Sequence, residues 1–470
     1  MQLSKTNFIH YLNCPKSLWI FKRDSGNYPQ GSFSTFLQKL TREGYEVEQH
    51  VRDLFARDGN CMVEFQKIFD TKDGLFARAD VFETTEDGQF LLYEVKSSTS
   101  VKTARNHNHL KDACFQKITA ERTGQKIDQV KIVHLNGDYV RAGDVVPQQL
   151  LHIEDITVRV QDIYDETASE MDEALALLKR EQLDRSGCTC IFKSRAHHCD
   201  TFSYFNPGIS KPSIYSLPRL SEKKRRELIA KDVFDLQDVP DDYSLSDIQG
   251  TVLLAAKAEK PQIDVGTIKS FLVSLQFPLY FFDYETFASA VPLVDGCSPH
   301  KPFPVQYSLH ILEEDGTLTH KEFLERKPQL PFNLIAQMEQ DFGAAGSVVS
   351  WHASYEKTQN KEMAQWFPGK ATFLADINDR MVDLEDVFKR AYVDARFDGS
   401  TSIKKILPVI CPHLGYEKLD VQDGASAMEA WQKMVQAHGG ESDAIADSLL
   451  EYCKLDTFAM VEIYRFLHAL

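Results

Sequence analysis

Apolar residues in the first 200 positions recur at two different spacings. Helical spacing predicts helices over residues 3–20, with a break at Cys14-Pro15, and over residues 42–55, 109–122 and 162–183. Alternating apolar and polar positions around the turn signal Asp87-Gly88 predict a β-hairpin over residues 75–96, and a further strand is predicted at 130–135. This mixture of helices and strands predicts an α/β domain over residues 1–203.

The pattern changes twice in the rest of the chain. Between residues 204 and 264, Pro, Ser and charged residues replace most large apolar ones, which predicts a small helical connector. Apolar runs then return and predict a second α/β domain over residues 265–470. Its predicted elements are strands at 279–287, 305–312 and 348–352 and a closing helix at 443–470.

The composition of the 470 residues is that of a globular protein, with 43% hydrophobic and 26% charged residues. The longest apolar stretch, residues 271–282, is interrupted by polar residues and is too short to cross a bilayer. The first residues lack the apolar core of a signal peptide. We therefore expect a soluble cytoplasmic protein without a membrane partner, and its nine cysteines do not predict a disulfide framework.

The net charge of −16 argues against a general attraction to nucleic acid. A polyanion would have to bind in a local basic groove. The basic run from Lys223 to Arg226 in the connector is the candidate for such contacts, and we predict that it binds phosphates. The alternative is that its side chains form the solvated face of a helix.

A first group of chemically active residues lies in and after the predicted hairpin. Glu94 and Lys96 are two positions apart and share one face of a strand, while Asp80 lies in the preceding strand within reach of Glu94. Two carboxylates can hold a divalent cation that lowers the pKa of a bound water, and the lysine could stabilise charge on a phosphate. Gln116 follows on a helix, where its amide could fix the lysine or a phosphate. Because Glu-x-Lys occurs three times in the chain, a surface ion pair is the alternative.

In this order, the residues resemble the PD-(D/E)XK nucleases, and the closest branch is the RecB-like one that includes the CRISPR adaptation nucleases. The match consists of Gly44-x-x-x-Glu48 in a helix, Arg78-Ala79-Asp80, Glu94-Val95-Lys96 and Gln116. The resemblance covers roughly residues 1–200 and implies a restriction-endonuclease-like fold in which Asp80 and Glu94 bind metal. It implies that Lys96 is the catalytic lysine and Gln116 an accessory helix residue. Glu48 stands where the family often has His and is the candidate for a further ligand.

Three cysteines lie within twelve residues of one another: Cys188, Cys190 and Cys199. The neighbouring His197 and His198 could complete a zinc site locally, so zinc is one interpretation. The other takes a fourth thiolate from Cys14, because several RecB-like nucleases close a [4Fe–4S] cluster with one N-terminal cysteine and three after the nuclease core. The resemblance to that layout implies an iron–sulfur cluster that fastens the first helix to the end of the domain.

A second group of candidate site residues lies in the C-terminal domain. Asp283 and Glu285 are two positions apart on a segment with five aromatic residues in eight, so both would project from one face of a buried strand. Burying two like charges is costly without a cation. Tyr452 and Asp456 lie one helical turn apart in the closing helix. The alternative is an edge strand with solvated acids.

This order resembles the DEDD exonucleases, which have an RNase H-like fold. The resemblance implies that Asp283 and Glu285 form the first motif, and that Asp456 and Tyr452 belong to the last motif of the Tyr-type subclass. Glu356 stands where the middle motif of the family has Asp. Four such acids could hold two cations, Mg²⁺ or Mn²⁺, that clamp the attacking water and the leaving oxygen of a phosphodiester.

Both resemblances predict a metal-dependent nuclease with a PD-(D/E)XK domain, a helical connector and an RNase H-like domain. The whole chain resembles a bacterial group that joins a RecB-like nuclease to such a C-terminal domain. The expected substrate is nucleic acid, single-stranded DNA rather than RNA, degraded from an end. Two alternatives stay open: a nucleic-acid-binding scaffold with one or both sites inactive, and an RNA 3′-exonuclease. Asp383 is a further candidate for the fourth acid.

Overall fold

The structure is a computed structural model, and it describes residues 2–29, 35–56, 62–104 and 107–470. It divides the chain into two compact units. Unit 1 comprises Met1–Gly208 and Ser289–His300, and unit 2 comprises Ile209–Ala288 and Lys301–Leu470. Each unit contains a sheet and helices, which confirms the predicted mixed α/β character. Among the described residues, no helix combines the length and the apolar character that a bilayer span requires.

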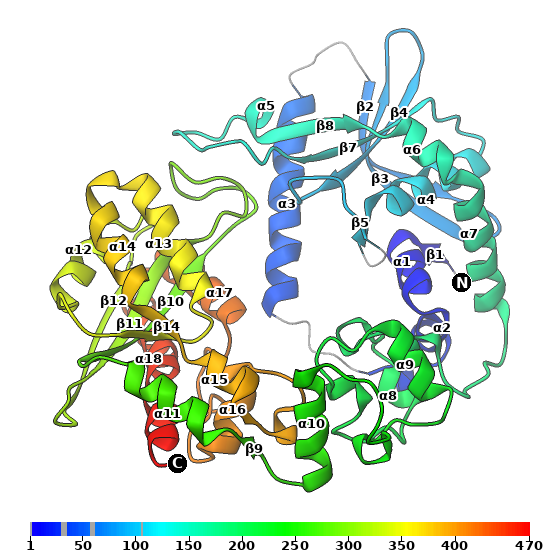
Figure 1. Cartoon of the computed structure of the whole chain (residues 1–470). Coiled ribbons are helices and arrows are strands. Elements are labelled where there is room, and N and C mark those ends of the chain that lie inside the picture. The colour runs from blue at the N-terminus through cyan, green and yellow to red at the C-terminus, as the bar shows by residue number, and fades with distance from the viewer. Residues whose placement is uncertain (1, 30–34, 57–61, 105–106) are drawn as a thin grey trace. The chain divides into compact units, whose positions relative to one another are not determined.

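Unit 1 is built on one mixed sheet (Figure 1). The strands of the unit are β1 (Leu3–Ser4), β2 (Met62–Asp70), β3 (Leu75–Thr84), β4 (Phe90–Lys96), β5 (Thr103–Ala104), β6 (His107–Asn108), β7 (Gln129–Leu135) and β8 (Leu151–Asp155). The order in the sheet is β1-β3-β4-β7-β8, with β2 antiparallel to β3, while β5 and β6 form a separate pair. The helices are α1 (Lys5–Asn13), α2 (Pro15–Arg23), α3 (Thr35–Phe55), α4 (His109–Arg122), α5 (Pro147–Leu150), α6 (Thr157–Asp162), α7 (Tyr164–Lys179) and α8 (Phe202–Phe205).

The period-2 alternation of β4 and β7 gives this sheet two apolar faces. Leu92 and Ile132 belong to a core with α1, α4 and α7, whereas Leu91 and Val133 belong to a core with α3 (Figure 1). Both faces are therefore covered by helices, and the polar residues Glu94 and Lys96 lie at the end of a buried strand.

The segment Ser289–His300 belongs to unit 1, although it lies between two strands of unit 2 in the sequence. Ala290 and Val291 are buried in the core beside α3. The Arg141 guanidinium donates to the carbonyl of Pro292 at 2.7 Å. A part of the unit 1 core is thus supplied by residues far along the chain.

Unit 2 contains a five-stranded sheet in the order β12-β11-β10-β13-β14 and a small pair, β15-β9. The strands are β9 (Gln262–Ile263), β10 (Leu279–Phe287), β11 (Phe303–Leu312), β12 (Leu318–Leu324), β13 (Val348–Ser350), β14 (Met381–Asp383) and β15 (Tyr392–Val393). The helices are α9 (Glu222–Ile229), α10 (Asp247–Ala258), α11 (Val265–Ser274), α12 (Phe332–Asp341), α13 (Ser354–Trp366), α14 (Ala371–Arg380), α15 (Glu385–Arg390), α16 (Ile403–Ile410), α17 (Gly424–Gln436) and α18 (Gly440–His468).

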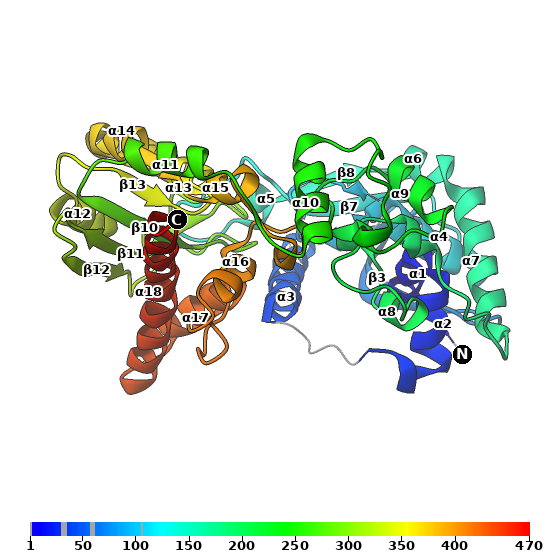
Figure 2. The same cartoon turned by 60° about the horizontal axis from the view of Figure 1, so that its bottom comes forward.

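The central strand β10 separates two kinds of surroundings. Tyr280, Phe282 and Tyr284 pack into a core with α12, α13 and α14. Residues of opposite parity face α18, where the Phe281 ring lies 5.7 Å from that of Tyr464. Helix α17 packs beside α18 (Figure 2). Asp283 and Glu285 are two and four positions after Phe281 on the strand, so both acids point to the same face as Phe281, towards α18.

Most predicted elements occur close to their predicted bounds. The predicted helix break is confirmed, because Cys14 ends α1 and is the N-cap of α2, with Pro15 in the first turn. Helix α3 begins at Thr35, earlier than predicted. From Ile209 onward, the segment expected to be a connector groups with unit 2.

Candidate active sites and a candidate metal centre

The first acid site lies where β3 and β4 separate. The pairing of these strands ends at Val81 and Tyr93, so Asp80 has no partner residue on β4. The Asp80 carboxylate instead accepts a hydrogen bond from the backbone N–H of Val95 at 2.8 Å. The end of the ladder thereby brings Asp80 towards Glu94, as the sequence predicted for this pair.

Glu94 is fully buried and is surrounded by donors. The Gln116 amide donates to one carboxylate oxygen, and Lys5 and Lys96 form ion pairs with the other, at 2.8 Å for Lys96. Lys96 also forms an ion pair with Asp112. The structure therefore brings Lys96 and Gln116 to Glu94 and adds two residues that the sequence analysis missed.

The charges of this site largely balance one another. Burial alone would raise the pKa of Glu94, but Lys5 and Lys96 outweigh that effect and lower it to about 2. Burial, followed by repulsion from Glu94, raises the pKa of Asp80 to about 7. At neutral pH, Glu94 is thus a paired carboxylate, and Asp80 is the acid for which a cation would compete with a proton.

Glu48 lies on α3 and lines the same small pocket as Asp80. The Gln66 amide donates to Glu48 at 3.4 Å. The structure thus places Glu48 beside Asp80, while the role of Glu48 as a metal ligand stays a prediction.

The two missed residues differ in how well the sequence could have indicated them. Asp112 is one helical turn before Gln116 on α4, so the two share a helix face and could have been named together. Lys5 lies in α1, far along the chain from Glu94, and no local pattern links the two.

Four cysteines converge in unit 1: Cys14, Cys188, Cys190 and Cys199. Their sulfur atoms all lie within 4.8 Å of one another, a spacing that could hold a metal ion. Apolar side chains that include Trp19, Ile20 and Phe205 surround them. Hydrogen bonding from Cys14 is the main cause that lowers the pKa of Cys188 to about 7, and it also lowers the pKa of Cys190. The pKa values of Cys14 and Cys199 are raised in the same cluster. Cys188 and Cys190 are therefore the members that reach the metal-binding thiolate form most readily.

The histidines next to this cluster have other contacts. His197 pairs with the Ser194 hydroxyl at 2.8 Å. His198 stacks on Phe202 and lies 3.2 Å from the Lys193 carbonyl. Within the described part of the chain, the metal-binding group contains Cys14 and neither histidine. The local zinc arrangement with these histidines is therefore not the one that the structure forms.

The second acid site is a pocket of unit 2 at the carboxyl ends of β10 and β13, the position where open sheets commonly bind ligands. Helix α13 follows β13 after a short loop, and Glu356 lies in its first turn, while Tyr452 and Asp456 come from α18. The pocket is lined by Asp283, Tyr284, Glu285, Trp351, His352, Tyr355, Glu356, Ile403, Lys404, Tyr452, Asp456 and Met460. All five residues predicted for the C-terminal site therefore meet in one pocket.

The four acids of this pocket repel one another. Glu285, Glu356 and Asp456 are buried and Asp283 is half-buried. Burial, followed by repulsion from Asp456, raises the pKa values of Asp283 and Glu285 well above the usual range. Burial also raises the pKa of Glu356 to about 8 and that of Asp456 to about 6. The charged form of this site is unfavourable unless a cation compensates it.

A cation would also satisfy groups that the described residues leave unpaired. Glu356 Oε2 is buried and has no hydrogen-bond partner among them. Atoms of Asp283, Glu285 and Cys453 lie within 4.8 Å of one another, close enough to share an ion. Burial raises the pKa of the Cys453 thiol well above its usual value, so this sulfur stays protonated. The charged donors of the site are therefore hard carboxylate oxygens.

Lys404 and Tyr416 belong to this site and were missed in the sequence. The Tyr416 hydroxyl donates to the Asp456 carboxylate at 2.6 Å. Lys404 donates to the Tyr452 hydroxyl at 3.1 Å, and its ammonium lies 5.1 Å from the ring centroids of both tyrosines. These residues come from α16 and the chain after it, for which no motif gave a signal.

Asp383 does not line the pocket. It ends β14 and accepts hydrogen bonds from the backbone N–H groups of His352 and Glu385, both at 3.0 Å. This geometry fixes two loops and favours Glu356 as the fourth acid.

The basic run in α9 makes several contacts within unit 2. Arg225 is buried and donates to the Leu220 carbonyl, and Lys224 donates to the Ser244 carbonyl. Arg226 forms an ion pair with Glu222 at 2.7 Å. Phosphate binding by the whole run stays a prediction, and these contacts would have to be shared with the phosphates.

A comparison with family models matches residues 280–402 to "Domain of unknown function (DUF2779)". Residues 280–402 are thus similar to this domain. The matched range contains Asp283, Glu285 and Glu356 and ends before Asp456.

Two curated proteins of mycoplasmas are similar to part of the chain. "Uncharacterized protein MG366 homolog" of Mycoplasma pneumoniae is 29% identical over 241 residues, which cover 46% of this chain and 36% of that protein. "Uncharacterized protein MG366" of Mycoplasma genitalium is 25% identical over 215 residues, 40% of this chain and 32% of that protein. The chain thus matches about a third of the length of these relatives.

A solved structure described as "Crystal structure of SSO0001" covers 36% of this chain and 75% of its own chain. The sequence identity is 12% and the TM-score is 0.23.

Proposed function

We propose that the protein is a metal-dependent nuclease and that the acid pocket of unit 2 is an active site. The observation that supports this most is the convergence of four carboxyls with raised pKa values on a pocket where, among the described lining residues, Lys404 is the one lysine or arginine. Such a site gains most from divalent cations, which are charged and prefer oxygen ligands. The alternative is a scaffold that binds nucleic acid without cleaving it.

The donor set fits Mg²⁺ or Mn²⁺. The four acids that would hold the ions are Asp283, Glu285, Glu356 and Asp456. When bound, the ions would supply an activated water and would stabilise charge on the phosphate. Tyr416 donates to Asp456 and keeps this carboxylate oriented. Lys404 donates to the Tyr452 hydroxyl, and the Tyr452 hydroxyl in turn donates to Asp456, so Tyr452 also keeps this carboxylate oriented.

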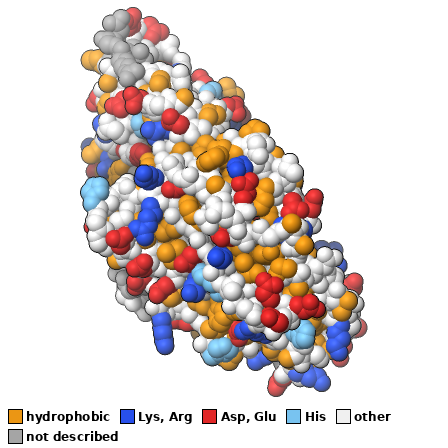
Figure 3. All heavy atoms as spheres, turned by 90° about the vertical axis from the view of Figure 1, so that its left-hand side faces the viewer, with side chains coloured by type: hydrophobic (Ala, Val, Ile, Leu, Met, Phe, Trp, Pro, Cys, Tyr) orange, Lys and Arg blue, Asp and Glu red, His pale blue; other side chains and the backbone are white. Residues whose placement is uncertain are grey.

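We propose single-stranded DNA as the substrate, with RNA as the alternative. On the face of the molecule in Figure 3, acidic and basic side chains are interspersed, and on its described part neither sign fills a continuous area. Binding of a polyanion would therefore depend on local cations at the site, and not on the overall charge of −16.

We propose a second nuclease site of the PD-(D/E)XK type in unit 1. Support comes from the meeting of Asp80 with Glu94, Lys96 and Gln116 at the end of the β3–β4 ladder. Asp80 and Glu94 would hold the cation, with Glu48 as a further oxygen donor. Lys96 would stabilise charge on the phosphate.

We further propose that the four cysteines hold a [4Fe–4S] cluster, with zinc as the alternative. The cluster would tie the junction of α1 and α2 to the segment after α7. Protein purified without oxygen should be brown and contain iron and sulfide, and Cys14→Ser should remove both. Colourless folded protein with stoichiometric zinc would contradict the iron–sulfur assignment.

A nuclease assay tests the main proposal. Labelled single-stranded DNA and RNA are incubated with Mg²⁺ or Mn²⁺ and with wild type, Asp283→Asn, Lys96→Ala and the double variant. Asp283→Asn should abolish trimming from the 3′ end, and Lys96→Ala should abolish the remaining cleavage. Asp315→Asn is the matched control, because Asp315 is exposed in the turn between β11 and β12 and does not line the pocket. Wild type that cleaves neither substrate with either metal would contradict the proposal.

A further inference from the structure

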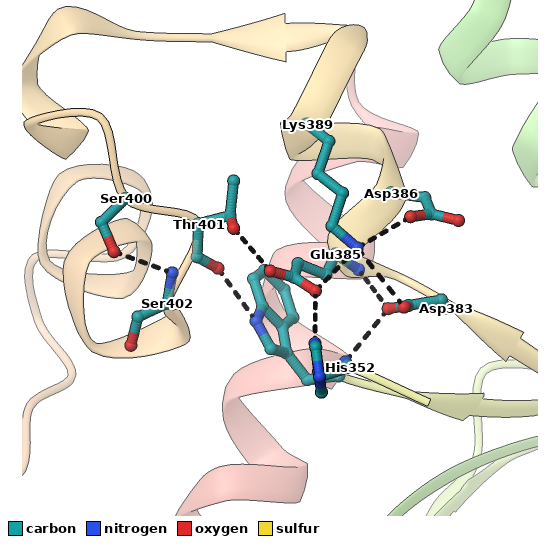
Figure 4. A network of polar contacts seen from close by, with 9 residues as sticks. His352, Asp383, Glu385, Asp386, Lys389, Ser400, Thr401 and Ser402 are labelled. Atoms are coloured by element: carbon teal, nitrogen blue, oxygen red, sulfur yellow. Dashed lines mark hydrogen bonds and ion pairs between the residues drawn. The ribbon is translucent and has the colours of Figure 1, made fainter. Parts of the chain in front are cut away.

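A buried carboxylate holds an exposed histidine at the edge of the acid pocket of unit 2 (Figure 4). His352 lies after β13 and lines this pocket. Its ring Nδ1 lies 3.1 Å from Glu385 Oε2. The His352 side chain is 64% exposed, whereas that of Glu385 is 9% exposed. The imidazole thus has one edge fixed by the protein and the other edge turned away from Glu385.

The residues around Glu385 hold it in place (Figure 4). Thr401 donates to its other carboxylate oxygen, and the Lys389 ammonium lies 2.8 Å from Oε2. Asp383 accepts from the backbone N–H groups of both Glu385 and His352. This network fixes the ring of His352 and its backbone together.

The backbone of His352 is in the left-handed region, with φ of 64°. This conformation is uncommon for residues other than Gly, although His is enriched in it together with Asn and Asp, and it recurs at functional sites. An exposed side chain gains little stability from such an arrangement. The conformational free energy spent on the left-handed backbone is explained if this backbone orients the ring of His352 towards a ligand in the pocket.

We propose that the Glu385–His352 dyad binds a phosphate of the strand that enters the pocket, with His352 Nε2 as the hydrogen-bond donor. This inference rests on the proposed function and deepens it. Nδ1–H donates to Glu385, and Nε2–H donates to a non-bridging phosphate oxygen, so that the imidazolium lies between two anions. The four acids nearby repel a phosphate, and His352 would join Lys404 in offsetting that repulsion. His352 contacts the substrate, and Glu385 is a positioning residue that acts through it.

Equilibrium binding tests the dyad separately from cleavage. The probe is a fluorescein-labelled single-stranded oligothymidylate, titrated by anisotropy with the full chain in Ca²⁺ under conditions where the strand stays intact. His352→Asn keeps a residue that tolerates the left-handed backbone and removes the imidazole. Glu385→Gln keeps the shape of the carboxyl and removes its charge. Each variant should weaken binding about 10-fold, the size of a hydrogen bond to a charged group.

The controls separate a binding role from a structural one. The double variant should bind no more weakly than His352→Asn alone, because Glu385 acts through the histidine. His300→Asn is the matched control, since His300 also has a left-handed backbone, with φ of 57°, and does not line the pocket. In wild type, the ring ¹⁵N signals of His352 should move to imidazolium positions when the strand is added.

The outcomes distinguish the two proposals. Unchanged affinity of His352→Asn, or unmoved ring signals, would overturn the dyad and leave the nuclease proposal standing. Wild type could bind the strand without cleaving it in Mg²⁺ or Mn²⁺, while His352→Asn loses binding. This result would support the dyad and overturn the nuclease proposal. A wild type that does not bind the strand would overturn both.

Discussion

The acid sites of the two units balance their negative charge in different ways. In unit 1, Lys5, Lys96 and Gln116 surround Glu94 and hold it as a carboxylate. In unit 2, the four acids meet with Lys404 as the one lysine or arginine among the described residues that line the pocket. The first site is charge-balanced within the chain, whereas the second site needs protons or cations from solution.

This contrast shows that the number of acids in a cluster does not by itself say how much the cluster gains from binding a cation. The pKa of Glu94 falls to about 2, while that of Glu356 rises to about 8, although both side chains are buried. The difference arises from the partners: two lysines outweigh the effect of burial on Glu94, whereas burial dominates at Glu356, which has no lysine partner among the described residues. Neutralising one acid should therefore have opposite effects in the two sites.

The largest expected effect is that of Glu94→Gln. The change leaves Lys5 and Lys96 in a largely buried site without their shared carboxylate, so the free energy of unfolding should fall by about 3 kcal/mol. Urea denaturation of the metal-free protein measures this. Glu83→Gln, on the neighbouring strand β3, is a control for a general effect of neutralising a strand carboxyl. A loss no larger than that of the control would show that Glu94 is not a charge-balancing partner.

Glu356→Gln should stabilise the metal-free protein at about pH 8 by about 1 kcal/mol or more, because it removes a carboxyl whose ionisation is unfavourable in the folded state. The same variant should lose most of the increase in melting temperature that Mg²⁺ or Mn²⁺ causes in wild type. Calorimetry with and without the metal measures both effects. Destabilisation of the metal-free protein would contradict the contrast between the two sites.

The two sites also predict opposite dependences on pH. The pKa of Glu356 is raised from 4.5 to about 8, so its contribution to stability is present below 4.5 and is lost as the pH rises to about 8. The pKa of Glu94 is lowered from 4.5 to about 2, so its contribution is present above 4.5 and is lost as the pH falls to about 2. Melting of metal-free wild type and Glu356→Gln across this range should give curves that diverge above about pH 5. Parallel curves would argue against the shift at Glu356.

The smallest expected effect is that of Tyr416→Phe. The hydrogen bond from Tyr416 opposes the burial that raises the pKa of Asp456, so its removal should raise this pKa further. Binding of Mn²⁺ should weaken about 5-fold, the size of one hydrogen bond. Titration calorimetry measures the affinity, and Tyr307→Phe is the control, because it loses a hydrogen bond to Asp341 outside the pocket.

The sequence could predict the parts of each site that share one element. Asp283 and Glu285 were found because a strand places alternate residues on one face, and Tyr452 and Asp456 because a helix places residues four apart on one face. Their meeting with Glu356 came from a resemblance, and so did the link from Cys14 to the other cysteines. Periodicity describes one element at a time and does not say which elements meet.

Three of the residues that the sequence analysis missed have no local pattern that links them to their partners. Lys5, Lys404 and Tyr416 reach their partners only through tertiary packing. His352 owes its position to a left-handed backbone at the end of β13, which no local signal for turns indicated. The fold class was predictable because apolar periodicity sets it, whereas the donors around each acid were not.

The segment Ser289–His300 has a consequence for synthesis of the chain. Ala290 and Val291 belong to the unit 1 core, but the ribosome makes them only after the first strand of the unit 2 sheet. Unit 1 therefore cannot complete its core when its first 208 residues have left the ribosome, and it waits for almost a hundred more. A gene fragment that ends after Gly208 would encode an incomplete unit. Folding of unit 1 is therefore completed only while the sequence of unit 2 is being synthesised.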